Sequence, residues 1–244
     1  MKHTRFFRDY TYGMRRALPI LFGFLPVAIT FAVMASQAGL SAAETIGMSA
    51  AVFAGASQIM SVGMVGAGAD LFAITIATFV LNLRHIIMST CVFSRLTHEK
   101  KRWYLPIGFG ITDETFAFFS LEKSERASAA YMLGLITVAY SSWVGGTALG
   151  AFVSGFLPQA VSDSLGIALY ALFIALVTPD VKKSLRLLLI VALTAILNTM
   201  LGLFLPQSWA IIAATLVGAG IGVFFVTDRD LGMVSEEETG GAAV

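Results

Sequence analysis

The chain has 244 residues, of which 57% are hydrophobic and 13% are charged, and its mean hydropathy is +0.82. Soluble domains carry about 25% charged residues, so this chain has too few charges to cover a surface that faces water. The formal net charge of +1 offers no electrostatic footprint for nucleic acid. The single cysteine, Cys91, excludes an intrachain disulfide, and no cluster of Cys and His residues predicts a metal site. No motif predicts a cofactor.

Apolar segments separated by short polar breaks follow one another along the whole chain. We place them at 18–38, 44–68, 69–93, 104–120, 128–156, 162–178, 186–205 and 207–227. Because strands with open edges would leave backbone groups without partners in lipid, and no ten-residue alternation indicates a barrel, these segments are predicted to be helices. The fold class is therefore all-α, a polytopic helical membrane protein with about 6–8 membrane segments of roughly 20 residues each.

The ends of the chain differ in charge from its middle. Residues 1–17 are basic and predict a cytoplasmic N-terminus ahead of a single transmembrane domain at 18–227. A basic start before an apolar stretch also resembles a cleaved signal peptide, but Pro26 and the many similar segments that follow favour a first membrane span. Residues 228–244 are acidic and rich in Gly and Ala, which predicts a disordered cytoplasmic tail.

Basic residues gather within residues 2–16, 95–102 and 182–186, and the positive-inside rule puts all three groups in the cytoplasm. Three apolar segments separate each group from the next, whereas an even number of crossings is required. We therefore predict that one segment in each trio is broken and leaves the membrane on the side where it entered, with its irregular backbone buried in protein. Segments 44–68 and 104–120 are the candidates, because both carry unusual polarity.

A short sequence echo suggests an internal repeat. Residues 78–82, Thr-Phe-Val-Leu-Asn, are similar to residues 194–198, Thr-Ala-Ile-Leu-Asn, and each string lies late in an apolar segment. Transporters are often built from inverted repeats, with the substrate site at the repeat interface. The echo pairs Asn82 with Asn198, and both are candidate substrate-binding residues.

Segment 69–93 carries the strongest polar signal. A polar residue recurs every three or four positions, which predicts one polar face along a single helix: Thr75, Thr78, Asn82, His85 and Ser89. Lipid would penalise such a face, so it must meet other helices or a hydrated cavity. Arg84 lies off this face, where it could either reach the cytoplasmic headgroups or serve the site.

Two further segments contain polar residues at membrane depth. Asp113 and Glu114 lie in the middle of segment 104–120, where ionised carboxylates need a cation such as Arg84, a substrate ammonium or a proton. The alternative is a shallow, partly wet segment. In segment 44–68, Ser57 and Gln58 follow small residues at which a helix could break and expose backbone groups to a zwitterion. Ordinary hydrogen bonding between helices is the alternative for these two residues.

Taken together, three strings resemble the AzlC family, the large subunits of branched-chain amino acid exporters linked to azaleucine resistance. They are Val-Phe-Ala-Gly-Ala-Ser-Gln at 52–58, Asn-Leu-Arg-His at 82–85 followed by Met-Ser at 88–89, and Thr-Asp-Glu at 112–114. Their order, their spacing and the chain length agree with the family over about residues 10–225.

The resemblance implies a secondary carrier in the bacterial inner membrane. It would export valine, leucine, isoleucine and similar apolar amino acids using the proton gradient, together with a small membrane subunit of the AzlD type. The residues themselves suggest the roles within it. We predict that Ser57, Gln58, Asn82, Arg84 and Asn198 bind substrate, and that His85, Asp113 and Glu114 couple protons.

Two other classes of function stay open. Ser57 as nucleophile and His85 as its base would make an intramembrane serine hydrolase or protease, although Gln58 replaces the expected glycine. A noncatalytic assembly subunit would use the polar face only to dock another membrane protein. The chain has no phosphate-binding loop of the kind that ATP hydrolysis requires.

Overall fold

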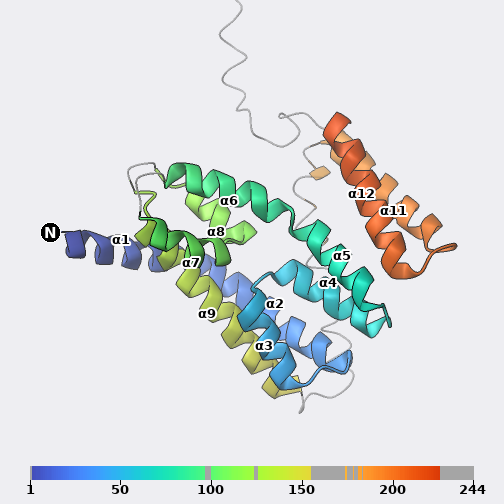
Figure 1. The fold of residues 1–244 in the computed structure, drawn as a ribbon, viewed down its shortest axis with the longest axis horizontal. Coiled ribbons are helices and arrows are strands. Elements are labelled where there is room, and N and C mark those ends of the chain that lie inside the picture. The colour runs from blue at the N-terminus through green and yellow to red at the C-terminus, as the bar shows by residue number, and fades with distance from the viewer. Residues whose placement is uncertain are drawn as a thin grey trace, which may run out of the picture. The chain divides into compact units, whose positions relative to one another are not determined.

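The computed structural model describes residues 2–96, 100–123, 126–154 and 184–225, together with residues 174, 178, 181 and 182. Every regular element within these ranges is a helix, which confirms the predicted fold class (Figure 1). The described residues form two compact units. The first contains α1 to α4, residues 78–82 of α5, and α6 to α9. The second contains residues 71–77 of α5 with α11 and α12.

The centre of the first unit is the pair α2 (Leu18–Gln37) and α9 (Ala129–Ser154), each long and apolar enough to cross a membrane. Small residues on α9 let the two backbones approach closely. A methyl group at Gly146 would lie 2.8 Å from the Ala28 Cβ, and one at Gly150 would lie 2.7 Å from the Ile29 carbonyl oxygen. Close van der Waals packing of this kind drives helix association in lipid.

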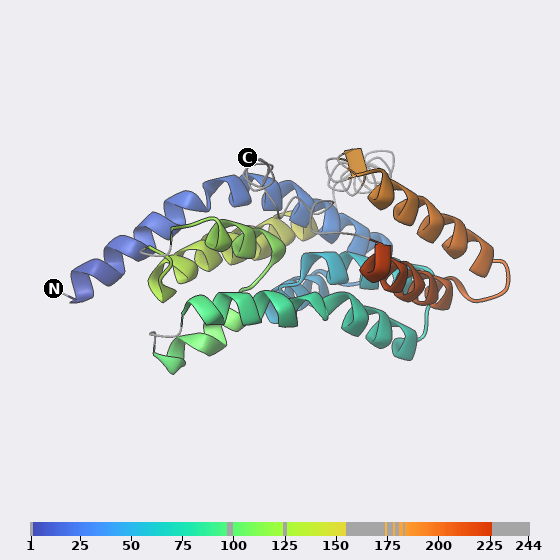
Figure 2. The same ribbon diagram turned by 90° about the horizontal axis from the view of Figure 1, so that it is seen from above.

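The basic N-terminus, which the sequence does not predict to be helical, forms α1 (Lys2–Arg16), and Figure 2 shows α1 leading into α2. One face of α1 packs on α9, and Tyr10 donates a hydrogen bond of 2.9 Å to the Thr137 hydroxyl. The two helices cross with glycine on both sides. A Cβ at Gly13 would strike the Tyr131 carbonyl, and one at Gly134 would lie 2.9 Å from the Met14 nitrogen. Arg15 and Arg16 favour the last turn of α1 through the helix dipole.

This crossing gives a direct test of the fold. We expect Gly134→Ala to lower the free energy of unfolding by about 1–3 kcal/mol, because the new methyl meets backbone atoms that cannot rotate away. Gly145→Ala is the matched control on the same helix, since nothing lies within 4 Å of its Cβ position. The control should be neutral or gain up to about 1 kcal/mol of helix propensity. Thermal unfolding of both purified variants in detergent measures the difference, and equal melting temperatures would contradict the close crossing.

Segment 44–68 is broken, as its polarity predicts. It forms α3 (Ala42–Val52) and α4 (Gly55–Gly66), separated by Phe53, whose φ of 45° ends α3 in a left-handed conformation, and by Ala54. Ser41 and Glu44 close the start of α3 with a capping box. A methyl group at Gly66 would lie 3.6 Å from the Ala38 Cβ, so α4 returns to the end of the unit where α2 stops.

Segment 104–120 is broken in the same way. It forms α7 (Tyr104–Phe109) and α8 (Asp113–Ser120), and Thr112 caps α8 with Thr115 after the break at 110–112. Arg95, at the end of α6, donates hydrogen bonds of 2.7 and 2.9 Å to the Phe119 and Ser120 carbonyls. Tyr104 stacks on Phe93 of α6 at 4.7 Å between ring centroids. Both ends of the segment therefore lie beside the end of α6.

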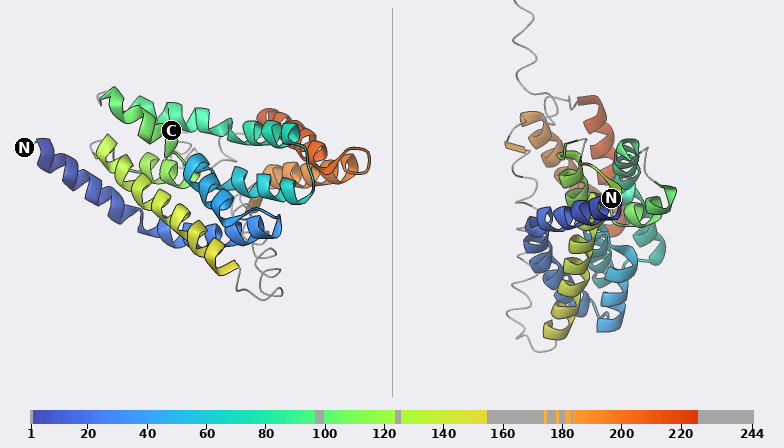
Figure 3. Two further views of the ribbon diagram at one scale, coloured as in Figure 1. Left: turned by 60° about the horizontal axis from the view of Figure 1, so that its bottom comes forward. Right: turned by 90° about the vertical axis from the view of Figure 1, so that its left-hand side faces the viewer.

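The two broken segments start from opposite ends of α2, which can be followed in Figure 3. Tyr12, before α2, donates a hydrogen bond of 3.3 Å to Glu122, which follows α8. Ala38, after α2, lies beside Gly66 at the end of α4. The out-and-back shape that the crossing count predicts is thus present in both segments. Their irregular backbone is buried in protein, as a re-entrant segment requires.

The sequence predicts a single helix over 69–93. The structure has a helical span over Leu71–Arg95 that is long and apolar enough to cross a membrane, but an irregularity at Leu83 divides it into α5 (Leu71–Asn82) and α6 (Arg84–Arg95). The Leu83 nitrogen donates to the Val80 carbonyl, three residues back, at 3.3 Å. The predicted polar face is therefore divided between two helices. The side chains on either side of Leu83 contact other segments, since Asn82 bonds to Ser57 and Arg84 pairs with Asp113.

In the second unit, α11 (Leu185–Leu201) packs on α12 (Gln207–Phe225), and a methyl at Gly218 would press on Thr194 of α11. Phe72 of α5 contacts Trp209 with ring centroids 5.9 Å apart. Both C-terminal helices are apolar, with 17 residues in α11 and 19 in α12. Most of the predicted segment 162–178, and the whole predicted tail at 228–244, lie outside the described residues.

Candidate substrate site at three helix breaks

The three helix breaks of the first unit meet through side chains from the three strings that the sequence singles out. The Asn82 Nδ2 atom donates a hydrogen bond of 3.2 Å to the Ser57 hydroxyl, which joins the α5–α6 break to the start of α4. The Arg84 guanidinium lies 2.7 Å from the Asp113 carboxylate, which joins the same break to the start of α8. We call this group of residues, with His85 and Glu114, the three-break site.

Ser57 lies at the buried edge of the site and is 1% exposed. Its hydroxyl donates to the Ala54 carbonyl at 2.9 Å, in the break before α4, and accepts from Asn82. Gly55 is needed beneath Trp143, because a methyl there would lie 2.8 Å from the indole ring. The first turn of α4 is therefore fixed on one side by α9 and on the other by Asn82.

Gln58 is fully buried, and both ends of its amide bind protein groups. Its Oε1 accepts from the Ala54 nitrogen and from the Trp143 indole, each at 3.1 Å. Its Nε2 donates to the Ser49 hydroxyl at 3.1 Å. Ser49 lies 2.8 Å from the Thr147 hydroxyl, which donates to the Trp143 carbonyl at 2.8 Å. This network holds the break at 53–54 against α9, and the predicted contact of Gln58 with substrate stays a prediction.

Arg84 and Asp113 form an ion pair that is open to the outside, with 39% and 50% of their side chains exposed. Two polar atoms next to this pair are buried and have no hydrogen-bond partner among the described residues, the Asn82 Oδ1 and the Arg84 Nε. Buried polar atoms in proteins are rarely left unpaired, and such exceptions mark sites that a ligand can complete. The site thus has one unpaired acceptor, the Asn82 Oδ1, and one unpaired donor, the Arg84 Nε, in addition to the Asp113 carboxylate and the rest of the Arg84 guanidinium.

The three predicted proton-coupling residues do not form one hydrogen-bonded chain. Asp113 and Glu114 occupy the first turn of α8, where the helix dipole stabilises negative charge, and Glu114 is half-buried. The His85 Nδ1 lies 3.3 Å from the Asn82 carbonyl oxygen, in the first turn of α6. Within the part of the chain that the structure describes, His85 makes no hydrogen bond to either carboxylate or to Ser57.

Aromatic side chains surround the same breaks. The sequence leads us to expect Phe and Leu residues around the substrate side chain, but assigns none of them as a site residue. Phe53, in the first break, lies 6.2 Å from Phe109 at the end of α7 and 5.1 Å from Tyr140 of α9, measured between ring centroids. Phe24 of α2 contacts Trp143 at 5.4 Å. The available signal in the sequence was that Tyr140 and Trp143 lie on the same helix, α9, as the small residues that pack against α2. These rings make an apolar cluster at the α3–α4 and α7–α8 breaks.

The predicted site residue Asn198 lies in α11, in the second compact unit. Its Oδ1 is buried and has no hydrogen-bond partner among the described residues. The two units are described separately, so its role in substrate binding stays a prediction. The internal repeat that pairs it with Asn82 also stays a prediction.

Comparison with known proteins assigns the chain to a family. The model of the AzlC protein family matches residues 19–157, more than half of the chain. The chain belongs to the AzlC family. It is 31% identical over 192 residues to the inner membrane protein YgaZ of Escherichia coli, covering 76% of this chain and 78% of that protein. It is 39% identical over 172 residues to an uncharacterized membrane protein of Archaeoglobus fulgidus, covering 70% of this chain and 75% of the relative.

A more distant relative is an uncharacterized membrane protein of Helicobacter pylori, which is 25% identical over 183 residues, covering 72% of this chain and 79% of that protein. No solved structure matches. The AzlC match extends from the first residues of α2 to just past the end of α9. It therefore contains all three helix breaks and every predicted site residue except Asn198. This chain is an AzlC-family membrane protein, and the family match coincides with the part of the fold that builds the three-break site.

Proposed function

We propose that this AzlC-family protein is the large subunit of a secondary exporter of branched-chain amino acids, with valine as a representative substrate. The observation that carries the proposal is the pairing of opposite charges beside spare hydrogen-bonding atoms. An amino acid presents an ammonium and a carboxylate. Asp113 and the Asn82 Oδ1 suit the ammonium, and Arg84 suits the carboxylate through its fork of donors.

The aromatic cluster supports an apolar substrate side chain. Phe53 lies in the break between α3 and α4, and Phe109 borders the break between α7 and α8. Both rings are therefore attached to the backbone that shapes the site. Ligand sites in proteins combine apolar and aromatic walls with a few polar groups that fix orientation. A branched aliphatic chain would bury its methyl groups against these rings while its charged end replaces the Arg84–Asp113 contact.

Two broken segments that start from opposite ends suggest how access alternates. Transporters place discontinuous helices around a central site and open it first to one side and then to the other. In this chain α3–α4 would shape one path and α7–α8 the other, and substrate would break the ion pair that links α6 to α8. Asp113, Glu114 and His85 carry the coupling proton in this scheme. The bacterial inner membrane, a cytoplasmic N-terminus and a small AzlD-type subunit belong to the same proposal.

Efflux of amino acids from proteoliposomes tests the proposal. Vesicles loaded with valine would contain this chain alone, this chain with its small subunit, or neither, and efflux would be followed with and without an imposed proton gradient. We expect valine and isoleucine efflux to require this chain and to exceed that of lysine, because a charged side-chain end would lose its hydration against the Phe53 and Phe109 rings. Flux that is indifferent to this chain would leave only the role of an assembly subunit.

The serine hydrolase alternative has a different readout. Catalysis by Ser57 would require His85 to take the hydroxyl proton, whereas that proton points at the Ala54 carbonyl and His85 faces the Asn82 carbonyl. A fluorophosphonate probe that labels wild-type protein but not Ser57→Ala would favour the hydrolase. We expect no labelling of Ser57, because among the described residues its hydroxyl bonds only to the Ala54 carbonyl and the Asn82 amide, neither of which is a base.

A further inference from the structure

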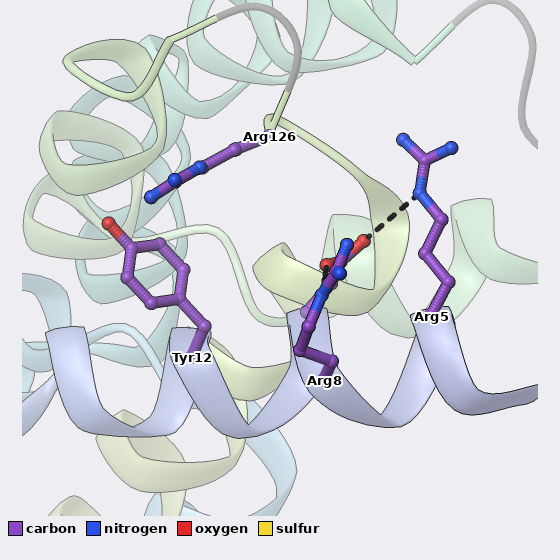
Figure 4. Close-up of a pocket in the computed structure, with 5 residues that line it drawn as sticks. Arg5, Arg8, Tyr12 and Arg126 are labelled. Carbon is purple, nitrogen blue, oxygen red and sulfur yellow. Dashed lines mark ion pairs between the residues drawn. The ribbon is translucent and has the colours of Figure 1, made fainter.

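A second polar site lies away from the three-break site, at the start of the first unit. A pocket of about 360 Å³ opens between α1 and the turn that precedes α9, and it is lined by Arg5, Arg8, Asp9, Tyr12 and Arg126 (Figure 4). This volume falls within the roughly 300–1,000 Å³ that is usual for small-molecule sites. Nothing in the proposed transport cycle uses these residues.

The pocket carries positive charge that its own residues do not neutralise. The pocket lining has three arginines and one carboxylate, Asp9, which lies 3.7 Å from the Arg5 Nε and 3.5 Å from the Arg8 Nε. Both arginines approach Asp9 through Nε, which leaves their terminal nitrogens for another partner. Glu122 is the nearest other acid in the described contacts, but it is largely buried beneath Tyr12 and accepts its hydroxyl proton.

Arg126 is held by an aromatic ring, whereas the Arg5 and Arg8 side chains are 69% and 75% exposed and contact Asp9. Arg126 lies over the Tyr12 ring, with 5.4 Å from its central carbon to the ring centroid. Figure 4 shows Arg126 and Arg5 on opposite sides of the pocket, with Arg8 between them. Planar guanidinium forks held in this way bind phosphate oxygens in pairs. Arg126 covers one face of the Tyr12 ring, and Tyr131 packs on the same ring with centroids 5.6 Å apart, which leaves little aromatic surface for the quaternary ammonium of a choline headgroup.

The surroundings of the pocket resemble the edge of a membrane. Phe7, next to Arg8 on α1, is 67% exposed, and Phe6 stacks on Trp103 at 5.5 Å between centroids. Arg102 lies over the same Trp103 ring at 4.6 Å. Aromatic rings and basic residues on an amphipathic helix are typical of the headgroup layer. We infer that Arg5, Arg8 and Arg126 form a site for the phosphodiester of an anionic phospholipid such as phosphatidylglycerol.

Lipid titration of the purified, full-length protein in detergent tests this site by native mass spectrometry. Phosphatidylglycerol should bind more tightly than phosphatidylcholine, and Arg126→Gln should weaken its binding about tenfold, the effect of one lost charge-assisted contact. Arg15→Gln is the matched control, because it removes the same charge from exposed α1 surface outside the pocket. Arg126→Lys distinguishes a specific phosphate site from general electrostatic attraction, since lysine keeps the positive charge but lacks the paired N–H donors of the guanidinium group.

Each outcome decides between specific alternatives. Weak binding by Arg126→Lys together with normal binding by Arg15→Gln supports the site. Binding that depends only on the number of charges, so that Arg126→Lys matches wild type, would overturn it. Inorganic phosphate and glycerol phosphate form a second arm of the titration. If either displaces phosphatidylglycerol at an equal concentration, the pocket is a soluble-phosphate site and the lipid assignment is wrong.

Discussion

Arg84→Gln and Asp113→Asn are each expected to lower valine efflux by at least about tenfold, because each removes one charge-assisted contact to a zwitterionic substrate. The loss should not come from unfolding. An ion pair with this much exposure contributes at most about 1 kcal/mol to stability, too little to unfold the protein. Proteoliposome efflux and the melting temperature of each variant, measured on the same preparation, separate the two effects.

The double variant Arg84→Gln/Asp113→Asn distinguishes a ligand site from a structural ion pair. If the pair only fastens α6 to α8, removing both charges leaves no unpaired charge behind and efflux should return toward wild type. If the pair binds the amino acid, the double variant stays folded but inactive. Asp70→Asn and Arg15→Gln are the charge-matched controls, and Asp70→Asn should also keep the hydrogen bond by which residue 70 caps α5. Full efflux by both single variants would remove Arg84 and Asp113 from the site.

The breaks in 44–68 and 104–120 could be predicted because their cause is local. Small residues before Ser57 and paired acids after Thr112 are visible in the sequence, and the charge count requires both segments to return to their starting side. The break at Leu83 has no such signal. Residues 71–83 contain no Gly or Pro, and the contacts of Asn82 and Arg84 beside the interruption are with Ser57 and Asp113, which are distant in the chain.

The composition of the site was predictable in the same partial way. Asn82, Arg84 and Asp113 stand out because charged and amide groups are rare at membrane depth, and the structure brings them together. What each one contacts could not be derived, because hydrogen-bond partners are set by packing between helices. Gln58 shows this most clearly. Its polarity singled it out as a substrate ligand, whereas its partners include Trp143, 85 residues away.

Gln58→Leu is expected to destabilise the protein by about 2–6 kcal/mol, because two buried donors lose their acceptor at a cost of about 1–3 kcal/mol each. These donors are the Ala54 nitrogen and the Trp143 indole. Thermal unfolding in detergent measures the loss. Gln37→Leu is the matched control, since Gln37 lies exposed in the last turn of α2. A Gln58→Leu protein as stable as this control, but with impaired efflux, would instead make Gln58 a substrate ligand.

Gln58→Glu examines the polarity of the same network. The Thr147 hydroxyl donates to the Trp143 carbonyl, so Ser49 must donate to Thr147 and can only accept from residue 58. A carboxylate at 58 would keep the Ala54 and Trp143 contacts but present a second acceptor to Ser49. A protonated carboxyl restores the donor. The Gln58→Glu protein should therefore be more stable than Gln58→Leu, and it should lose stability as pH rises and the buried acid ionises.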